Sequence, residues 1–380
     1  MAASDRLYPL APAPALFRQS EAASDRLPRG EEPVFAMNAL PTVTVIMPVY
    51  NEEPYIAHCL GRVLEQQYPS DRLELIVADG RSTDRTREIV QSFQVDHPNI
   101  HLIDNPERIV STGLNRAIKA ARGELIVRLD GHCEYPQDYV MRVVELRHQT
   151  GADDAGGVLV PLGSSNYASQ AVAAAYYSPV GIGGALKGHR DSEEIVEADT
   201  VHGGCWSRER LLALGGFDAE MVRNQDDELS FRLRKAGGHI VRSSTIRVKY
   251  SVRNSFRKLF LQFAQYGYWK VRVLQKHPLQ SSVKHIVPSV FVLALLASAA
   301  FAPVSRVALL ALVIFAGGYA LVMAMAGLRE AAKREWRLWP GISWALPVMH
   351  FGYGLGFLIG WIRWLAGALP TDRVFERTTR

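Results

Sequence analysis

The chain has 380 residues, of which 48 % are hydrophobic, and a formal net charge of +5. This length exceeds one average domain and suits a catalytic domain with an appendage. The positive charges form no basic stripe interleaved with aromatic residues, and many flank hydrophobic segments, so nucleic acid is not an expected partner and anionic lipid is favoured. The hydrophobic residues concentrate after Val283, where a soluble surface would need polar side chains.

The first forty residues are rich in Ala, Pro and charge. The string AASDRL occurs there twice, from Ala2 to Leu7 and from Ala22 to Leu27. This repeat is too short for a repeat architecture, and no secretory hydrophobic core accompanies it. We expect a flexible arm over residues 1–40, with no chemical role.

From Thr42 the chain alternates between strand-like and helix-like pieces. This order is typical of an α/β domain with a doubly wound, mostly parallel sheet, in which ligands bind beyond the carboxyl ends of the strands. The predicted strands are 43–47, 73–78, 100–103 and 124–129, and the helices between them are 55–67, 84–93 and 113–121. The segments at the strand ends are 48–53, 79–84 and 130–132.

The region from Met141 to Lys249 carries mixed signals. Helices are expected at 139–147, 168–177 and 227–236, a Gly/Ser loop around 156–165, a glycine-rich stretch at 181–188, and a final strand at 240–248. We therefore place the catalytic domain at residues 41–250. An amphipathic, interfacial segment on the acceptor side is expected over residues 251–284.

A hydrophobic region follows over residues 285–369. Two membrane-spanning helices are expected at Ile286–Ala302 and Val307–Gly327, joined by a short link. A third apolar stretch, Gly341–Trp361, contains Pro347 and several glycines. It leaves two possibilities open, three spans or two spans with a re-entrant segment.

Cations indicate the topology of this region. Lys270, Arg272, Lys276 and Lys284 precede the first span, and the loop 329–337 after the second is also basic. The positive-inside rule places both in the cytosol, together with the catalytic domain, at an inner or plasma membrane of bacterial type. Residues 370–380 form a polar tail.

Polar side chains follow the first two predicted strands. After Pro48, Tyr50 offers an aromatic face and Glu52 a carboxylate to a nucleotide base, although an ordinary strand-to-helix turn has a similar composition. Asp79 ends the next strand, where its carboxylate can accept a hydrogen bond from a uracil or guanine imino group. We expect nucleotide binding at this edge of the sheet.

Asp130 and His132 project from the end of the fourth predicted strand. Side chains at positions i and i+2 of an extended chain face the same way, so the pair can bind one divalent ion that bridges the diphosphate of a nucleotide. Imidazole suits a borderline transition metal, which favours Mn²⁺ over Mg²⁺.

Three consecutive acids, Asp226, Asp227 and Glu228, stand where a helix is predicted to begin. Favourable charge at the helix N-terminus explains Asp227 and Glu228. Asp226 is left over, in the loop just before that helix. We predict that it is a general base that deprotonates an acceptor hydroxyl.

Together these positions resemble family 2 glycosyltransferases of the GT-A fold, from about Thr42 to Lys276. The resemblance implies that Pro48–Glu52 and Asp79–Asp84 bind the nucleoside. The family's Asp-x-Asp metal motif becomes Asp130-Gly-His132. Its Glu-Asp catalytic pair becomes Gln225–Asp226, and its Gln-x-x-Arg-Trp motif becomes Gln265–Trp269, with Tyr268 in place of Arg.

Within the family, the strings DGHC, HGGCW, RNQDDEL and QYGYWK resemble succinoglycan-type glucosyltransferases. That subgroup implies inverting transfer of a sugar, glucose above all, from a UDP-sugar to a polyprenyl-diphosphate-linked glycan, and a homo-oligomer is compatible with it. Contacts to the donor sugar or the acceptor are then expected from His202, Gln225, Asp227, Gln265, Tyr268 and Trp269. For Trp269, the alternative is an anchoring role at the membrane interface.

Three other functions remain open. A polyprenyl-phosphate sugar synthase uses an acceptor that is already ionised and needs no base, so Asp226 and the segment Gln265–Trp269 argue against it. A processive polysaccharide synthase would need a channel of several more spans. A non-catalytic nucleotide-sugar-binding protein would release no UDP with any donor and metal.

Overall fold

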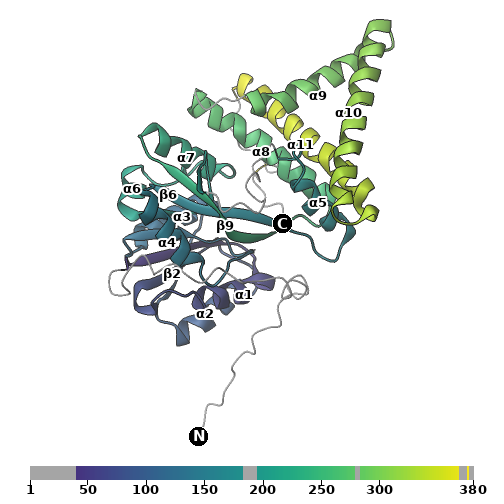
Figure 1. Cartoon of the computed structure of the whole chain (residues 1–380). Helices are drawn as coiled ribbons and strands as arrows, with labels where there is room; N and C mark the ends of the chain where they lie inside the picture. Colours follow the sequence, from purple (N-terminus) through teal and green to yellow (C-terminus); the bar gives the residue numbers. More distant parts are fainter. Residues whose placement is uncertain (1–39, 183–194, 279–282, 368–374, 376–380) are drawn as a thin grey trace. The chain divides into compact units, whose positions relative to one another are not determined.

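A computed structural model describes residues 40–182, 195–278, 283–367 and 375 (Figure 1). The arm predicted over residues 1–40 lies, apart from Leu40, outside the described residues, as does the polar tail apart from Phe375. The chain divides into two compact units. The first contains Met1–Val160, Arg190–Glu220 and Gln225–Tyr250, and the second contains Pro161–His189, Met221–Asn224 and Ser251–Arg380.

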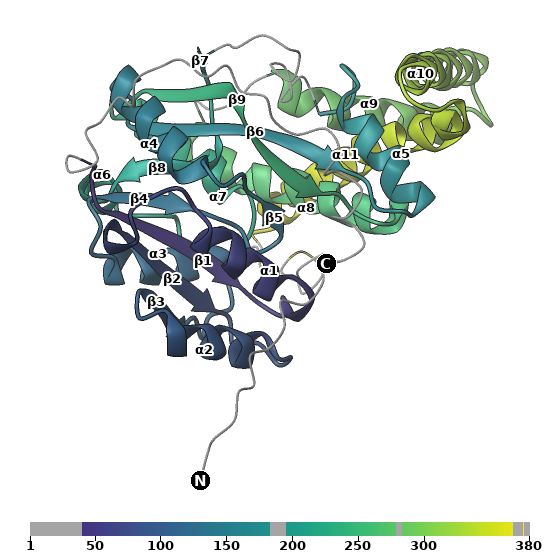
Figure 2. The ribbon, with the colours of Figure 1, turned by 60° about the horizontal axis from the view of Figure 1, so that its bottom comes forward.

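The first unit is built on one twisted sheet (Figure 2). Within the described residues the strand order is β3-β2-β1-β4-β8-β6-β9-β5, and β7 pairs with β9. The strands are β1 (Val43–Val49), β2 (Leu73–Asp79), β3 (Ile100–Asp104), β4 (Leu125–Arg128), β5 (Cys133–Glu134), β6 (Asp154–Leu162), β7 (Ile195–Glu197), β8 (His202–Ser207) and β9 (Ile240–Ser251).

The sheet is mixed. Strands β1 to β4 pair in parallel, as predicted, whereas β8 runs antiparallel to β4 and β6, and β9 runs antiparallel to β5 and β7. The α/β class is thus confirmed, but the parallel arrangement ends at β4. The antiparallel half contains close contacts that only glycine permits: a Cβ on Gly157 of β6 would lie 2.2 Å from the carbonyl oxygen of Ile246 in β9.

Helices cover both faces of this sheet. Because side chains alternate along a strand, Val45 and Met47 pack in one core cluster with Ile56 of α1, whereas Ile46 packs in another with Leu114 of α3. The helices are α1 (Glu53–Leu64), α2 (Thr86–Asp96), α3 (Val110–Ala120), α4 (Tyr139–Thr150), α6 (Arg208–Ala213) and α7 (Gln225–Lys235), with a 3-10 turn at Ser70–Arg72.

The second unit is helical. It contains α5 (Tyr167–Tyr176), α8 (Phe256–Lys276), α9 (Val283–Phe301), α10 (Arg306–Ala332) and α11 (Trp339–Leu365), with a 3-10 turn at Trp336–Leu338. Helices α8 and α11 lie in backbone contact at glycines. A Cβ on Gly267 of α8 would lie 2.1 Å from the Tyr353 carbonyl oxygen, and one on Gly356 of α11 would lie 2.0 Å from that of Ala264. Small residues of this kind let apolar helices pack closely.

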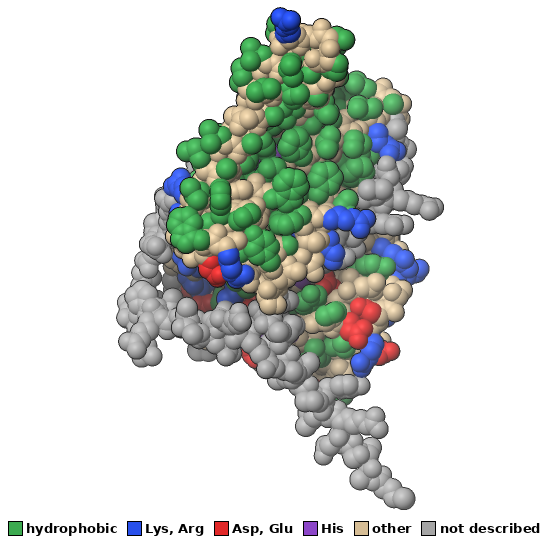
Figure 3. Space-filling model, turned by 90° about the vertical axis from the view of Figure 1, so that its right-hand side faces the viewer, with side chains coloured by type: hydrophobic (Ala, Val, Ile, Leu, Met, Phe, Trp, Pro, Cys, Tyr) green, Lys and Arg blue, Asp and Glu red, His purple; other side chains and the backbone are tan. Residues whose placement is uncertain are grey.

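Two helices in the described part of the chain, α10 and the segment Trp336–Leu365, are long and apolar enough to cross a membrane, by length and composition. Figure 3 shows hydrophobic side chains over much of this helical unit. The span predicted at Ile286–Ala302 falls on α9, whose described apolar part, His285–Phe301, is shorter. The third apolar stretch forms one helix, α11, which continues through Pro347.

The backbone contact between α8 and α11 predicts that this pair of helices tolerates no side chain at Gly267. Gly267→Val would force the helices apart and should destabilise the protein by about 1–3 kcal/mol. Gly317→Val in α10 is the matched control, because a Cβ there meets nothing within 4 Å. Thermal unfolding in detergent micelles measures both, and equal midpoints for the two variants would contradict the contact.

Candidate active site

The loops that follow β1 and β2 are tied to each other at one edge of the sheet. The Asn51 backbone N–H donates to the Ser82 hydroxyl at 2.9 Å, and the Thr83 N–H donates to the Asn51 side-chain oxygen at 2.8 Å. Asn51 has a φ of 53°, a left-handed conformation that asparagine tolerates. Beside it, the Tyr50 ring lies 5.9 Å from the guanidinium of Arg108. The two loops predicted to bind the nucleotide therefore lie together.

Asp79, at the end of β2, is fully buried. Its carboxylate accepts from the Ser82 hydroxyl at 2.6 Å and from the Arg87 guanidinium at 2.8 Å. Asp79 thus stabilises the loop that follows β2. A nucleobase that donates to this carboxylate would share it with Ser82 and Arg87. Pro48 lies within β1, and Glu52, largely buried, directly precedes α1.

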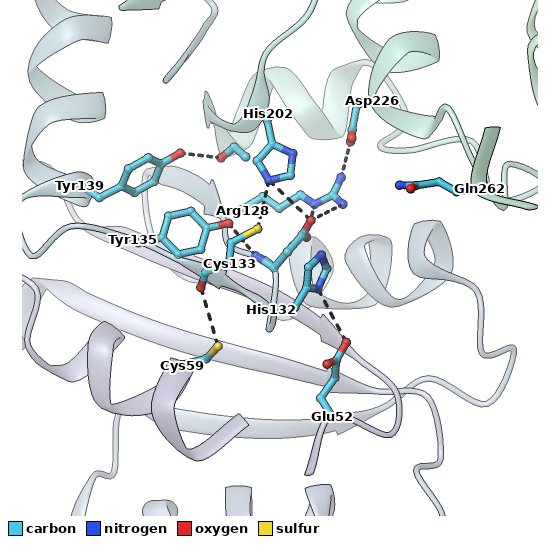
Figure 4. Close-up of polar contacts among 12 residues, drawn as sticks. Glu52, Cys59, Arg128, His132, Cys133, Tyr135, Tyr139, His202, Asp226 and Gln262 are labelled. Atoms are coloured by element: carbon cyan, nitrogen blue, oxygen red, sulfur yellow. Dashed lines mark hydrogen bonds and ion pairs between the residues drawn. The ribbon is translucent and has the colours of Figure 1, made fainter. Parts of the chain in front are cut away.

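A buried arginine joins two carboxylates beyond the end of β4. The Arg128 side chain is 5 % exposed. Its Nε donates to Asp130 Oδ1 at 3.0 Å, and its Nη1 donates to Asp226 Oδ1. Figure 4 shows Arg128 reaching toward Asp226. Arg128 was not among the residues predicted for the site, although it stands two positions before Asp130 and could have been inferred to share its face.

Two histidines lie close to this network. The Nε2 atom of His202 is 3.8 Å from Asp130 Oδ2 and 3.7 Å from Cys133 Sγ, whereas His132 turns its Nδ1 toward Glu52 Oε1 at 3.7 Å (Figure 4). His202 begins β8, and β8 runs antiparallel to β4. The start of β8 therefore lies beside the end of β4. His202, which was predicted to contact the sugar or the acceptor, therefore lies next to Asp130.

The two carboxylates that Arg128 joins differ in acidity. Burial would raise the pKa of Asp130, but Arg128, followed by His202 and His132, outweighs this effect and holds the pKa below its ordinary value. Burial raises the pKa of Asp226. Arg128 lowers it, but the negative charge of Asp130 opposes Arg128, and the pKa stays above its ordinary value. The Asp226 side chain is still 31 % exposed, so a ligand can reach it.

The donor groups around Asp130 fit a divalent ion. Asp130 is ionised at neutral pH, and burial lowers the pKa of His202, which leaves a neutral imidazole. No three His, Cys, Asp or Glu side chains among the described residues are arranged to hold a metal by themselves. An ion that acts on a diphosphate needs only one or two protein ligands, because phosphate oxygens and water complete its shell. Asp130, with His202 3.8 Å away, has groups of the right chemistry for this, whereas His132 faces Glu52; a divalent ion held by Asp130 and His132 stays a prediction.

Asp226 lies in the first turn of α7, not in a loop before it. The helix begins at Gln225, two residues before the predicted start at Asp227. Gln225 is largely buried, and Asp227 follows Asp226 on the same turn. Glu228, fully buried, pairs with Arg232 at 2.7 Å. The run of acids is thus divided between a structural ion pair at Glu228 and the contact of Asp226 with Arg128.

Gln265, Tyr268 and Trp269 lie on α8 in the second unit, and their side chains are buried. The Trp269 indole N–H donates to the Phe375 carbonyl oxygen at 3.1 Å, and the Tyr268 ring stacks on the Phe375 ring with centroids 4.2 Å apart. Little of the indole face is therefore exposed in this structure. Contact of these three residues with an acceptor stays a prediction.

Comparison with known proteins gives consistent matches. The family model described as glycosyl transferase family 2 matches residues 44–178. The succinoglycan biosynthesis protein ExoA of Rhizobium meliloti is 30 % identical over 325 residues, which cover 82 % of this chain and 93 % of that protein. The dolichyl N-acetyl-alpha-D-glucosaminyl phosphate 3-beta-D-2,3-diacetamido-2,3-dideoxy-beta-D-glucuronosyltransferase of Methanococcus voltae is 26 % identical over 62 % of this chain and 74 % of that protein.

A solved structure shares the fold. The mannosyltransferase PcManGT from Pyrobaculum calidifontis, in complex with GDP-Man and Mn²⁺, matches with a TM-score of 0.55 and 22 % identity, over 85 % of this chain and 89 % of that one. This likeness supports the predicted GT-A type of α/β fold, here with a mixed sheet. Since the Rhizobium relative is similar over nearly its whole length, the chain belongs to glycosyltransferase family 2 and is a glycosyltransferase.

Proposed function

We propose that this glycosyltransferase transfers a sugar, glucose above all, from a UDP-sugar to a polyprenyl-diphosphate-linked glycan in exopolysaccharide or surface-glycan assembly. The observation that carries the proposal is the pairing of Arg128 with both Asp130 and Asp226. This pairing holds the Asp130 carboxylate, which suits a metal–diphosphate, beside the Asp226 carboxylate, which suits the acceptance of a proton. The name of the Rhizobium relative, a succinoglycan biosynthesis protein, supports the exopolysaccharide role.

The reaction in this proposal is a single displacement. An acceptor hydroxyl oxygen forms a bond to the anomeric carbon while the bond from that carbon to the diphosphate oxygen breaks, and the hydroxyl proton passes to Asp226. The raised pKa of Asp226 makes its carboxylate a stronger base. Attack on the face opposite the departing UDP converts an α-linked donor into a β-linked product.

The remaining site residues bind the donor in this proposal. Pro48, Tyr50, Glu52 and Asp79 form the nucleoside pocket, with the Tyr50 ring against the base. Asp130 and His132, with His202 beside them, would hold a divalent ion, Mn²⁺ in preference to Mg²⁺. That ion supplies positive charge to the diphosphate as UDP departs. Gln225 and Asp227 flank the base on α7 and are proposed to contact the sugar.

A membrane-borne acceptor is supported by the second unit. Helix α10 exposes apolar side chains along its length, which lipid would cover. Its last turn carries Arg329, and the residues after it include Lys333, Arg334 and Arg337. These cations favour a cytosolic position for the loop and the catalytic domain. The name of the Methanococcus relative contains a dolichyl-linked sugar phosphate, which is also a lipid-linked sugar although it carries one phosphate and not two.

A donor panel tests the function. Purified enzyme is incubated with UDP- and GDP-sugars, Mn²⁺ and lipid-linked glycans extracted from membranes, and nucleoside diphosphate release and glycan-lipid mass are recorded. We expect UDP release and a gain of one sugar per acceptor, largest with UDP-glucose. Release without any change in acceptor mass, or no release with any donor, would exclude transfer to these lipids.

The base assignment predicts a large kinetic effect from a change that preserves shape. Asp226→Asn should lower kcat by about 10²- to 10⁴-fold, because general-base help is lost, while UDP affinity persists. Asp130→Asn should weaken donor binding as well. The matched control is Asp199→Asn, whose carboxylate pairs with Arg234 on the surface at 3.0 Å and should leave turnover unchanged. An Asp226→Asn enzyme that keeps more than about a tenth of wild-type turnover, or an α-linked product, would exclude this base.

The metal assignment predicts that chelation abolishes turnover. Mn²⁺ should restore UDP release better than Mg²⁺, because imidazole suits the softer ion. His132→Asp should reverse that preference, since a second carboxylate suits Mg²⁺. Turnover rates across a metal series measure both effects, and full activity in excess EDTA would rule the metal out.

The apolar surface of α10 predicts an integral membrane protein. The chain should stay with the membrane fraction through high salt and alkaline carbonate and leave it only in detergent, as followed by immunoblotting. Salt would remove a chain held by its cations alone. Release by salt or carbonate would therefore contradict insertion.

A further inference from the structure

The segment Met221–Asn224, just before α7, is held by α8 at three points. The Met221 side chain is fully buried in a cluster with Tyr268 and Trp269 of that helix. The Arg223 Nε donates to Gln265 Oε1 at 3.1 Å. These contacts lie within the second unit, and they use the part of α8 that sequence analysis assigned to the acceptor.

The third contact is made by Asn224. Its Nδ2 donates to the backbone carbonyl oxygen of Tyr266 at 3.0 Å, and its φ is 60°. Asparagine tolerates this left-handed conformation, as at Asn51, whereas most other residues with a side chain rarely adopt it. Here the hydrogen bond to α8 fixes the residue at which the chain turns into α7.

The chain continues from Asn224 through Gln225 to Asp226, so two peptide units separate the fixed residue from the predicted base. A change in φ or ψ at Asn224 redirects the backbone that carries Asp226. In enzymes, a displacement of about 1 Å in a reacting group can cost on the order of 100-fold in rate.

We propose that Arg223 and Asn224 are positioning residues for Asp226, and that Gln265 acts on the reaction through Arg223 without touching the acceptor. Gln265 is 2 % exposed, and its side-chain oxygen already accepts from Arg223. Helix α8 therefore serves as the support on which the entry to α7 is fixed. This inference rests on the proposed role of Asp226 as base.

A double-mutant cycle tests the inference with the full-length enzyme in detergent. Arg223→Ala and Gln265→Ala should each lower kcat on the order of 10- to 100-fold, with the KM values of donor and acceptor unchanged. The double variant should lose no more than either single variant, because both remove one contact. Gln275→Ala is the matched control, since Gln275 accepts from Arg272 on the same helix at 2.9 Å and that pair does not involve Met221–Asn224.

The results that would contradict this inference can be told apart from one another. If Gln265→Ala raises the acceptor KM and leaves kcat intact, Gln265 contacts the acceptor directly and the proposal is wrong. Multiplicative losses in the double variant, or wild-type kcat in both single variants, also overturn it. If Asp226→Asn is active, the proposed base fails whatever the cycle shows; if Asp226→Asn is inactive and the cycle shows no loss, only the positioning inference fails.

A second pair of variants keeps the test decisive should Arg223→Ala lower the unfolding temperature. Asn224→Gly keeps access to the left-handed conformation and loses only the hydrogen bond, whereas Asn224→Ala loses both. We expect kcat to fall in the order wild type, Gly, Ala, with the KM values unchanged. Equal kcat for Asn224→Ala and wild type would contradict a positioning role.

Discussion

The guanidinium of Arg128 stands between Asp130 and Asp226, and the site depends on this contact. A buried cation without partners is unstable in a protein interior, so the arginine fixes both carboxylates, one beyond β4 and one on α7. The two carboxylates still differ in acidity: Arg128 outweighs burial at Asp130 and holds its pKa below the ordinary value, whereas burial raises the pKa of Asp226 above it. Two neighbouring carboxylates in different environments can take different roles, one as an anion that binds charge and one as a base.

The mixed sheet explains why these residues meet. Parallel pairing places Val49 of β1 beside Asp79 of β2, so the loops after both strands share one edge. At β4 the pairing becomes antiparallel, and the neighbouring strand enters the same edge where a parallel strand would leave it. His202 therefore comes to the site from the start of its strand, whereas Asp79 and Asp130 come from the ends of theirs.

The sequence predicted the parallel half of this arrangement well. The apolar runs of β2 and β4 are recognisable in the sequence, and the acid that ends β2 and the acid two residues beyond β4 located Asp79 and Asp130. The antiparallel half was harder, because β6 and β8 contain glycine pairs at 156–157 and 203–204 that interrupt any apolar alternation.

The residues that the sequence did not predict depend on contacts distant in the chain. Arg128 is recognisable as a bridge only once Asp226, 98 residues away, is placed beside it. The start of α7 at Gln225 follows from the geometry of Asn224, which no local pattern reports. Pro347 and the glycines of α11 resembled a broken helix, yet glycines such as Gly356 are what allow this helix to touch α8.

The division of the chain into interleaved segments has a consequence for biosynthesis and dissection. Pro161–His189 and Met221–Asn224 belong to the helical unit, although catalytic-unit segments precede and follow both in the chain. During translation, neither unit is complete when the first strands have been synthesised. Helix α5 can pack in its unit only after α11 has been synthesised as well. Likewise, one proteolytic cut cannot release the catalytic unit intact. A soluble fragment for study would need α5 and the segment before α7 rebuilt to stand without α8 and α11, and a simple truncation does not achieve this.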